Sequence, residues 1–424
     1  MSHDERDLLV RELRDRSRDV GGHPIELDDV RASAQRIRWR RRAVGAAVAA
    51  VVVAIAVPVG LGATGTLTAG NPPIATRTSS PPAPPSPSRS VATTPSPTVK
   101  SSPKQPTQPA GTIPLTTVGL PAGAPPAIGY LLGRTLHRPD GGIQQVGEYF
   151  SLTPYHGGWL ATGPAHGEMS VVTIDAQGKV IDTQPGSDRL TVSQDGTSTA
   201  WVTTSSNGQR AAVNRGIPSG MSNGTATQAV PGVQAGVPVT PVGFVAGGSV
   251  VYTVGGGNPS VRVTDFGGHD RALPGLINAR GTSETDDLVA GQTSSSNSGS
   301  CWEVRDVSSG ARVWGTCKFA LGQFSQDGKY VYGTDAYGDG AGSGTVAILD
   351  AHTGKVLADF VHVGGPDDQL AVSDLAWEYA DTLLGVVSEK GSWHILRFTP
   401  GGKLELLVGP MHQGLPPFHF VARP

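Results

Sequence analysis

The chain has 424 residues and a formal net charge of −2, with 58 Gly and 34 Pro but only 16% charged and 6% aromatic residues. So much Gly and Pro favours turns and linkers over extensive helix. From residue 127 to the end, 26 acidic residues against 18 Lys and Arg give a net charge of −8, so no nucleic acid is expected as a partner of that region.

The first 42 residues are polar and are predicted to form a short cytoplasmic helical segment. Residues 1–30 hold nine acids and five Arg, a net charge of −4, whereas residues 31–42 hold six Arg and no acid, a net charge of +6. Acids in the first turn and good helix formers predict a helix over residues 4–19. Its apolar face is small, so it is either a solvated helix or a docking segment for a cytoplasmic protein.

Residues 43–63 form a stretch of 21 residues without a charge, which is long enough to cross a lipid bilayer as a transmembrane helix. Basic residues and one interfacial Trp flank it on the N-terminal side, namely Arg36, Arg38, Trp39, Arg40, Arg41 and Arg42. The positive-inside rule then predicts a single-pass protein in the cell membrane, with a cytoplasmic N-terminus and an extracytoplasmic C-terminal domain. A signal peptide is the alternative, but the polar lead is long for one.

Residues 64–126 are predicted to be a disordered linker rich in Pro, Ser and Thr. Within it, residues 70–126 contain 16 prolines in 57 residues, a composition that cannot bury a core. As polyproline II it would reach on the order of 170 Å at most. Such a stalk suits a domain held away from a membrane.

Residues 127–424 are predicted to be all-β, because their apolar stretches are short, alternating or β-branched and are bounded by turn residues. The turns form two alternating series that recur roughly every 40 to 50 residues, the repeat of a four-stranded propeller blade. An unpaired half-blade at 128–150 is expected to pair with Phe418–Ala422 and close the ring. We predict seven blades, with six or eight as alternatives.

Two short segments carry a family resemblance. Phe324-Ser325-Gln326-Asp327-Gly328-Lys329-Tyr330-Val331-Tyr332 and its earlier copy Val192–Trp201 resemble the F-S-P-D-G-x-x-[IL]-x-[YF] element of WD-repeat and TolB-like β-propellers, with Gln in place of Pro. The segment 346–357 is similar to the strand-turn-strand that follows this element in the family. The resemblance implies a ligand- or protein-binding platform, although some members are enzymes. The Asp-Gly corners are expected to serve geometry, and recognition to lie in irregular loops such as Tyr337–Gly344.

Cys301 and Cys317 are the only cysteines, and they bracket a predicted hairpin with a Ser308-Ser309-Gly310 turn. If Gly310 adopts a left-handed conformation, Val307 faces Ala311 and Cys301 lies opposite Cys317. Opposed Cβ atoms are close enough for a disulfide, so the alternative of two reduced thiols is less favoured. A disulfide agrees with an extracytoplasmic domain.

Several motif matches lack the structure that their chemistry needs, so no catalytic, cofactor-binding or metal-binding residues are predicted. Gly220–Gly224 fits the G-x-S-x-G elbow, and Gly342–Ala347 fits a dinucleotide pattern, yet neither precedes a predicted helix. Asp335–Gly340 lacks two ligands of an EF-hand loop, which leaves only a looser Ca²⁺ site on this acidic loop as an alternative. The tryptophans of this region, including Trp201, Trp302 and Trp377, are expected to pack between blades.

The sequence therefore predicts a non-catalytic binding or sensing module that meets an extracytoplasmic protein or an envelope ligand. The cytoplasmic segment resembles the Arg-rich leaders of bacterial membrane proteins that accompany extracytoplasmic-function sigma factors, which implies a signalling partner such as a sigma factor at residues 1–42. Two alternatives remain open: a propeller hydrolase or lyase acting on envelope polymers, and a structural scaffold of the cell envelope.

Overall fold

The computed structural model of the chain describes residues 111–421, apart from 166–167, 186–189, 205–210, 217–225, 232, 234–236, 338–341, 365–369 and 413–417. The predicted cytoplasmic segment, the transmembrane helix at 43–63 with its flanking residues, and the linker up to residue 110 lie outside the described residues. Within the described part, no helix is long and apolar enough to cross a membrane. The chain divides into two compact units, Met1–Gln105 and Pro106–Pro424, and the description below concerns the second.

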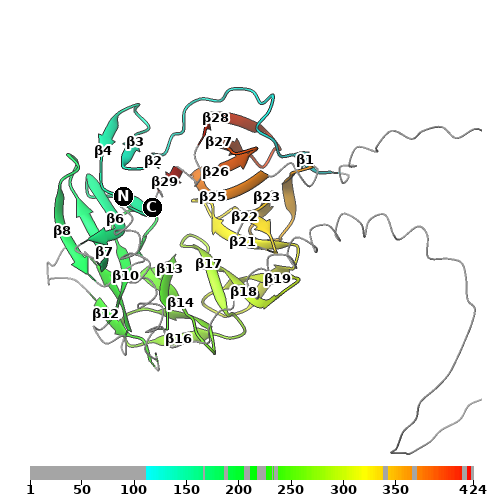
Figure 1. Ribbon diagram of the computed structural model, residues 1–424. Coiled ribbons are helices and arrows are strands. Elements are labelled where there is room, and N and C mark those ends of the chain that lie inside the picture. Colours follow the sequence, from blue (N-terminus) through cyan, green and yellow to red (C-terminus); the bar gives the residue numbers. More distant parts are fainter. Residues whose placement is uncertain are drawn as a thin grey trace, which may run out of the picture. The chain divides into compact units, whose positions relative to one another are not determined.

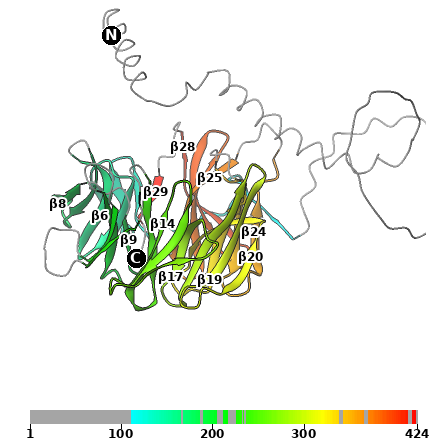
Figure 2. The same ribbon diagram turned by 90° about the horizontal axis from the view of Figure 1, so that it is seen from below.

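Seven β-sheets form a ring, which confirms the predicted seven-bladed propeller (Figure 1). Seen from the side, the strands run between the two faces of the ring (Figure 2). In each blade the strand that lies nearest the axis is the inner strand, and three further strands follow outward in antiparallel order; blade 6 alone among the described blades carries a fifth, parallel strand.

Blades 2 to 4 each use four consecutive strands, the first of them being the inner strand. Blade 2 consists of β5 (Ser151–Tyr155), β6 (Gly158–Ala165), β7 (Glu168–Ile174) and β8 (Val180–Pro185). Blade 3 consists of β9 (Leu190–Val192), β10 (Thr199–Thr204), β11 (Ala211–Gly216) and β12 (Ala226–Ala229). Blade 4 consists of β13 (Val239–Val245), β14 (Ser249–Val254), β15 (Ser260–Thr264) and β16 (Asp270–Leu273), with a 3-10 turn, η1 (Ala246–Gly248), after β13.

Blades 5 to 7 follow the same plan, and blade 6 gains one strand at its outer edge. Blade 5 consists of β17 (Asn278–Ser283), β18 (Leu288–Ser296), β19 (Gly299–Asp306) and β20 (Arg312–Thr316). Blade 6 consists of β21 (Phe319–Phe324), β22 (Tyr330–Asp335), β23 (Thr345–Asp350), β24 (Val356–Val361) and the added β1 (Ile113–Pro114). Blade 7 consists of β25 (Leu370–Tyr379), β26 (Thr382–Glu389), β27 (Ser392–Phe398) and β28 (Leu404–Met411).

Blade 1 joins the two ends of the described chain and closes the ring. Its inner strand is β29 (Phe418–Phe420), and its outer strands are β2 (Tyr130–Leu132), β3 (Thr135–His137) and β4 (Ile143–Gln145). β29 pairs antiparallel with β2, so that Tyr130 faces Phe420. The predicted partner of the half-blade is therefore confirmed, and β29 covers the inner edge that β2 would otherwise leave unpaired.

The hydrophobic core is divided into seven clusters, one between each pair of neighbouring blades. β23 shows how one strand serves two of them: Val346 and Ile348 pack toward blade 7, whereas Ala347 and Leu349 pack toward blade 5. A strand whose two faces are both buried needs apolar residues at successive positions, which explains the continuous apolar run Val346–Leu349 in β23. Trp201, Trp302 and Trp377 are buried at such interfaces, as predicted.

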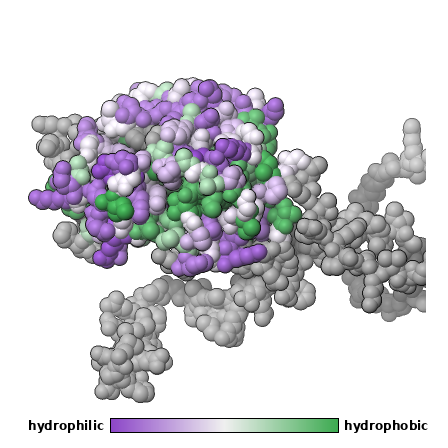
Figure 3. Space-filling model, turned by 90° about the horizontal axis from the view of Figure 1, so that it is seen from above, coloured by the Kyte–Doolittle hydropathy of each residue, from purple (hydrophilic) through white to green (hydrophobic). Residues whose placement is uncertain are grey.

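The apolar side chains that remain exposed are scattered over the described surface. The most exposed large ones are Val118, Ile143 and Phe150, at 69%, 67% and 63%. In the view of Figure 3, apolar patches are interrupted by polar residues. Single exposed apolar residues are common on folded proteins.

The propeller unit begins earlier than the sequence predicts. Residues 111–126, expected to be the end of the linker, form a strap along the outer edges of blades 6 and 7. β1 adds to β24 as a parallel strand, and Ala122 makes a parallel bridge with Leu406 of β28. Leu115 is 1% exposed and belongs to the cluster between these blades. The Pro-rich composition obscured this strap, because its four large apolar residues, Ile113, Leu115, Val118 and Leu120, are too few to set a clear hydrophobic period.

The predicted disulfide between Cys301 and Cys317 is present, but the hairpin around it differs by one residue near its turn. Gly310 has φ of 69°, as expected. Asp306, rather than Val307, is hydrogen-bonded to Ala311. A bulge at Val313 restores the predicted register further along, where Trp302 faces Thr316. The two cysteines are therefore opposite each other despite the shifted turn.

Candidate binding pocket

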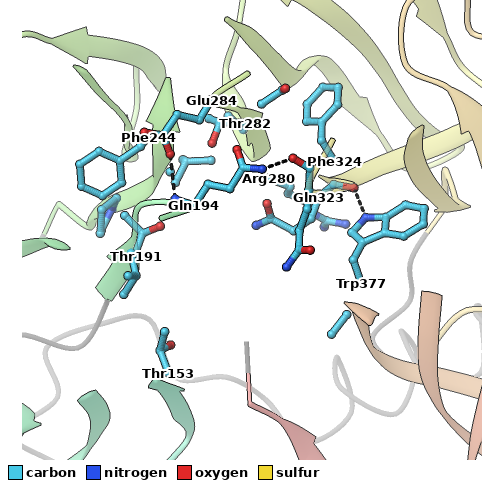
Figure 4. A pocket seen from close by; sticks show the side chains of 18 of the residues that line it. Thr153, Thr191, Gln194, Phe244, Arg280, Thr282, Glu284, Gln323, Phe324 and Trp377 are labelled. Carbon is cyan, nitrogen blue, oxygen red and sulfur yellow. Dashed lines mark hydrogen bonds between the residues drawn. The ribbon is translucent and has the colours of Figure 1, made fainter. Parts of the chain in front are cut away.

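A pocket of about 480 Å³ lies on the ring axis, between the inner strands of blades 2 to 7 and the turns that follow them. Its wall combines hydroxyl, amide and apolar side chains with one guanidinium and one carboxylate. Figure 4 shows that Gln194, Arg280 and Gln323 lie on the side formed by blades 3, 5 and 6, whereas Thr153 lies across from them. A concave site with a few convergent polar groups is the default place to look for ligand binding.

β-bulges shape this wall. In β13 the pairing with β14 shifts between Pro241 and Gly243, and in β17 the pairing with β18 shifts between Ala279 and Gly281. The extra residue in β17 is Arg280. A bulge changes the direction in which its residue points, and here it leaves Arg280 exposed on the channel side of the blade.

Glycines allow the inner strands of neighbouring blades to approach closely. A Cβ at Gly281 would overlap the carbonyl oxygen of Gly322 in blade 6, and a Cβ at Gly243 would overlap the Thr282 hydroxyl in blade 5. The obstacle at Gly281 is backbone, which cannot rotate away. The wall around Arg280 and Gln323 therefore depends on the absence of a side chain at this position.

Gly281→Ala is expected to lower the free energy of unfolding by about 1–3 kcal/mol, because blades 5 and 6 must separate to admit the methyl group. Denaturation of the full-length chain, followed by tryptophan fluorescence, measures this change. Gly257→Ala is the matched control, since a Cβ there has no neighbour within 4 Å. Equal denaturation midpoints for the two variants would show that the close approach is unimportant.

Two turns of identical geometry place glutamines at the pocket. In both Ser-Gln-Asp-Gly turns, the Gly N–H donates to the Ser carbonyl, at 2.8 Å for Gly196 and 2.9 Å for Gly328. Both glycines have positive φ, 71° and 72°. The Asp-Gly corners thus serve geometry, as predicted, but the glutamine before each of them, Gln194 or Gln326, lines the pocket.

Gln194 links blade 3 to blades 5 and 6 across the inner end of blade 4. Its N–H donates to Glu284 Oε2 at 2.8 Å, and its side-chain amide donates to the carbonyl oxygen of Gln326. Its amide oxygen accepts from Thr285 Oγ1 at 3.2 Å. The TolB-like pattern has Pro at this position, and Pro has no N–H to donate to Glu284. The departure from the family pattern therefore has a structural consequence at the pocket.

Ionisable groups also lie close to the pocket without lining it: Asp374 precedes the lining residue Leu375 on β25, and Tyr332 lies on β22. Asp374 of β25 accepts the Phe420 N–H at 3.1 Å. Burial raises the pKa of Asp374, although this hydrogen bond and the nearby His419 oppose the rise. Burial, with a contribution from the Asp374 charge, raises the pKa of Tyr332 to about 12. Tyr332 is therefore a neutral phenol at physiological pH.

The motif matches rejected from the sequence gain no site in the structure. Gly220–Gly224 lies outside the described residues, as does part of the Asp335–Gly340 loop. Asp335 itself accepts hydrogen bonds from Ser343 and from the Gly344 N–H. After Gly342 the chain enters β23 rather than a helix. Among the described residues, no group of three or more His, Cys, Asp or Glu could hold a metal ion.

Sequence reasoning did not find the pocket residues. The sequence carries a signal only for Gln194 and Gln326, which stand where the family pattern has Pro. Nothing in the sequence marked Arg280 and Gln323, because their exposure to the channel results from bulges. Trp377 was predicted to pack between blades and does so, but it also lines the pocket and donates its indole N–H to the Gln323 carbonyl at 2.9 Å.

The sequence matches no known family model and no curated protein. Among solved structures, the chain is similar to TolB from Acinetobacter baumannii, with 15% identity over 72% of this chain and 69% of TolB, at a TM-score of 0.41. Hydrazine synthase from Kuenenia stuttgartiensis shares 17% sequence identity over 58% of this chain and 76% of that chain, with a TM-score of 0.41. Prolyl oligopeptidase B from Galerina marginata shares 11% sequence identity over 64% of this chain and 43% of that chain, with a TM-score of 0.45. Likeness at this level concerns the fold alone. The sheet order of the described residues itself shows a seven-bladed β-propeller, the fold that the TolB-like resemblance of the Ser-Gln-Asp-Gly turns predicts.

Proposed function

We propose that this chain is a single-pass membrane protein that presents its propeller outside the cytoplasmic membrane as a non-catalytic binding or sensing module. The uncharged stretch at 43–63 with its basic flank supports the anchor. The Cys301–Cys317 disulfide supports an oxidising location. Binding to an extracytoplasmic protein or envelope ligand would be relayed through one helix to a cytoplasmic signalling protein, such as a sigma factor, at residues 1–42.

The composition of the channel pocket is the observation that favours binding over chemistry. Of the described residues that line it, only Arg280 and Glu284 are ionisable. Arginine stays protonated at physiological pH, which makes Arg280 a poor general acid or base. Glu284 accepts the Gln194 N–H. Amides and hydroxyls supply the rest of the polar wall, and such groups fix a ligand by hydrogen bonds.

Photocrosslinking in living cells tests this proposal. A benzophenone amino acid replaces Gln323, which is exposed to the channel, or Gln228 of β12, which is half-buried on an outer strand and is absent from the pocket lining. We expect an adduct with an envelope component from position 323 and none from position 228. Mass spectrometry of the adduct identifies the ligand and shows whether it is chemically unaltered. Equal labelling from both positions, or an altered ligand, would contradict a non-catalytic channel site.

The location is tested separately through the two cysteines. We expect both thiols in intact cells to resist a maleimide reagent until a reductant is added, because a disulfide persists outside the cytoplasm. Gel shifts of the alkylated chain report the thiol state. A phosphatase fused after Pro424 provides an independent readout, since it folds only outside the cytoplasm. Freely alkylated cysteines together with an inactive phosphatase would place the propeller in the cytoplasm.

A hydrolase or lyase is the second candidate, and the nearness of His419 to the buried Asp374 is what favours it. A carboxyl group with a raised pKa beside a histidine is a common arrangement for general acid catalysis. The Asp374 carboxylate, however, also accepts the Phe420 N–H, which gives it a role in closing the ring. If Asp374→Asn abolished turnover of an envelope polymer without unfolding the chain, the enzymatic alternative would replace the binding module.

A further inference from the structure

Arg280 differs from every other arginine that the structure describes. Of the other eight, six pair with a carboxylate, and two donate to main-chain carbonyl oxygens. The Arg280 guanidinium has no hydrogen bond or ion pair with any described residue, and its one contact of note is with the ring of Trp302, at 5.0 Å. An unpaired guanidinium on the wall of a pocket retains five N–H donors for a ligand.

The surroundings of Arg280 hold its side chain in place without neutralising it. The β17 bulge sets the direction of the residue. The buried Trp302 ring provides a face over which the guanidinium lies, an attraction that survives partial exposure. Tyr332, whose pKa is strongly raised, offers no negative charge there. Rigid support of this kind reduces the entropy that a ligand contact would otherwise cost.

Neighbouring side chains in the pocket also present unused donors. The amides of Gln323 and Gln326 line the cavity and make no hydrogen bond with described residues. Glu284 brings the net charge of the lining residues to zero, and residues 127–424 carry −8. These charges disfavour a multiply charged anion such as phosphate. One planar guanidinium with amide donors beside it matches one carboxylate.

We infer that the pocket is a carboxylate-binding site in which Arg280 holds the carboxylate and Gln323 contacts the polar groups next to it. This inference rests on the proposed function and gives the chemical class of its ligand. The apolar part of the wall, including Phe244, Leu375 and Trp377, accommodates the uncharged remainder of the ligand. Two kinds of ligand present one carboxylate next to polar groups: the C-terminal end of a peptide and a uronic acid sugar.

The test uses fluorine NMR of the full-length chain in detergent with 5-fluorotryptophan, and the Trp377 signal is assigned through Trp377→Phe. The probes are acetyl-trialanine with a free carboxylate, the same peptide with a C-terminal amide, and glucuronate beside glucose. We expect a saturable shift of the Trp377 signal with one or both carboxylate probes at millimolar concentration. The amide and glucose probes should bind at least roughly tenfold more weakly, the loss expected for a hydrogen-bonded charge.

Arg280→Gln should remove the preference for the carboxylate probe, and Arg280→Lys should restore part of it, because charge without the planar fork binds less well. Arg312→Gln is the matched control, since Arg312 lies on β20 of the same blade and outside the pocket lining. Equal affinity for carboxylate and neutral probes, no shift with any probe, or an Arg280→Gln variant that keeps the preference would overturn the inference. Crosslinking from position 323 that persists in the Arg280→Gln background would show that the binding module stands while the carboxylate assignment fails.

Discussion

Replacing Glu378 with Ala is expected to lower the free energy of unfolding by about 3–5 kcal/mol, because the buried Arg397 loses its closest partner and keeps only the longer contact with Glu405, at 3.5 Å. Glu378 is fully buried and Arg397 is 12% exposed at its side chain. The two form a bidentate pair, with N–O distances of 2.7 and 2.8 Å, and this pairing raises the pKa of Arg397. Glu378 also accepts the Ala127 N–H at the end of the strap. One carboxylate therefore joins two strands of blade 7 to the chain entering blade 1.

Urea denaturation of the full-length chain, followed by tryptophan fluorescence, measures this loss. Glu148→Ala is the matched control, because Glu148 pairs with Arg134 while both side chains are 66% exposed; its cost should stay below about 1 kcal/mol. A double variant, Glu378→Leu with Arg397→Met, should recover much of the loss, since it leaves no unpaired charge. If Glu378→Ala and Glu148→Ala shared one midpoint, the buried pair would have no special part in stability.

The scaffold was predictable from the sequence because its signals are local and repeated. Asp327-Gly328 and Asp195-Gly196 mark turns by a backbone requirement that Gly meets. The recurrence of such turns gave the blade count. The disulfide followed from the spacing of Cys301 and Cys317 around one short turn. The predicted pairing register of that hairpin was wrong by one residue near the turn because of the bulge at Val313. No turn residue in the sequence indicates this bulge.

The pocket and the strap were not predictable, for two different physical reasons. The direction of Arg280 depends on a bulge and on the close approach of blade 6 at Gly281, which are tertiary effects. The strap depends on contacts between residues far apart in sequence, such as Leu115 N–H with the Val361 carbonyl at 3.0 Å. Local composition around Leu115 favours an extended linker, and burial against blades 6 and 7 overrides that preference.

Leu115→Ala is the second substitution for which we expect a large effect, a loss of about 2–5 kcal/mol in the free energy of unfolding. Leu115 packs in the cluster between blades 6 and 7 with Val346 and Phe360. The rest of this strap adds the partly buried side chains of Ile113 and Leu120 and hydrogen bonds such as the one that the Thr117 N–H donates to Glu389 at 2.6 Å. Truncating Leu115 removes the strap's most buried apolar side chain and leaves a cavity that the neighbouring strands cannot fill.

Val118→Ala is the control, since Val118 lies on the same strap but is 69% exposed; its effect should stay within about 0.5 kcal/mol. Denaturation midpoints of the full-length variants give the comparison, and limited proteolysis reports whether cleavage within 111–126 becomes faster in Leu115→Ala. If the strap is integral to the propeller, stability and protease resistance fall together in Leu115→Ala and not in Val118→Ala. Faster cleavage with an unchanged midpoint would instead mean that the ring holds together without its strap, and that the closure of blade 1 by β29 suffices.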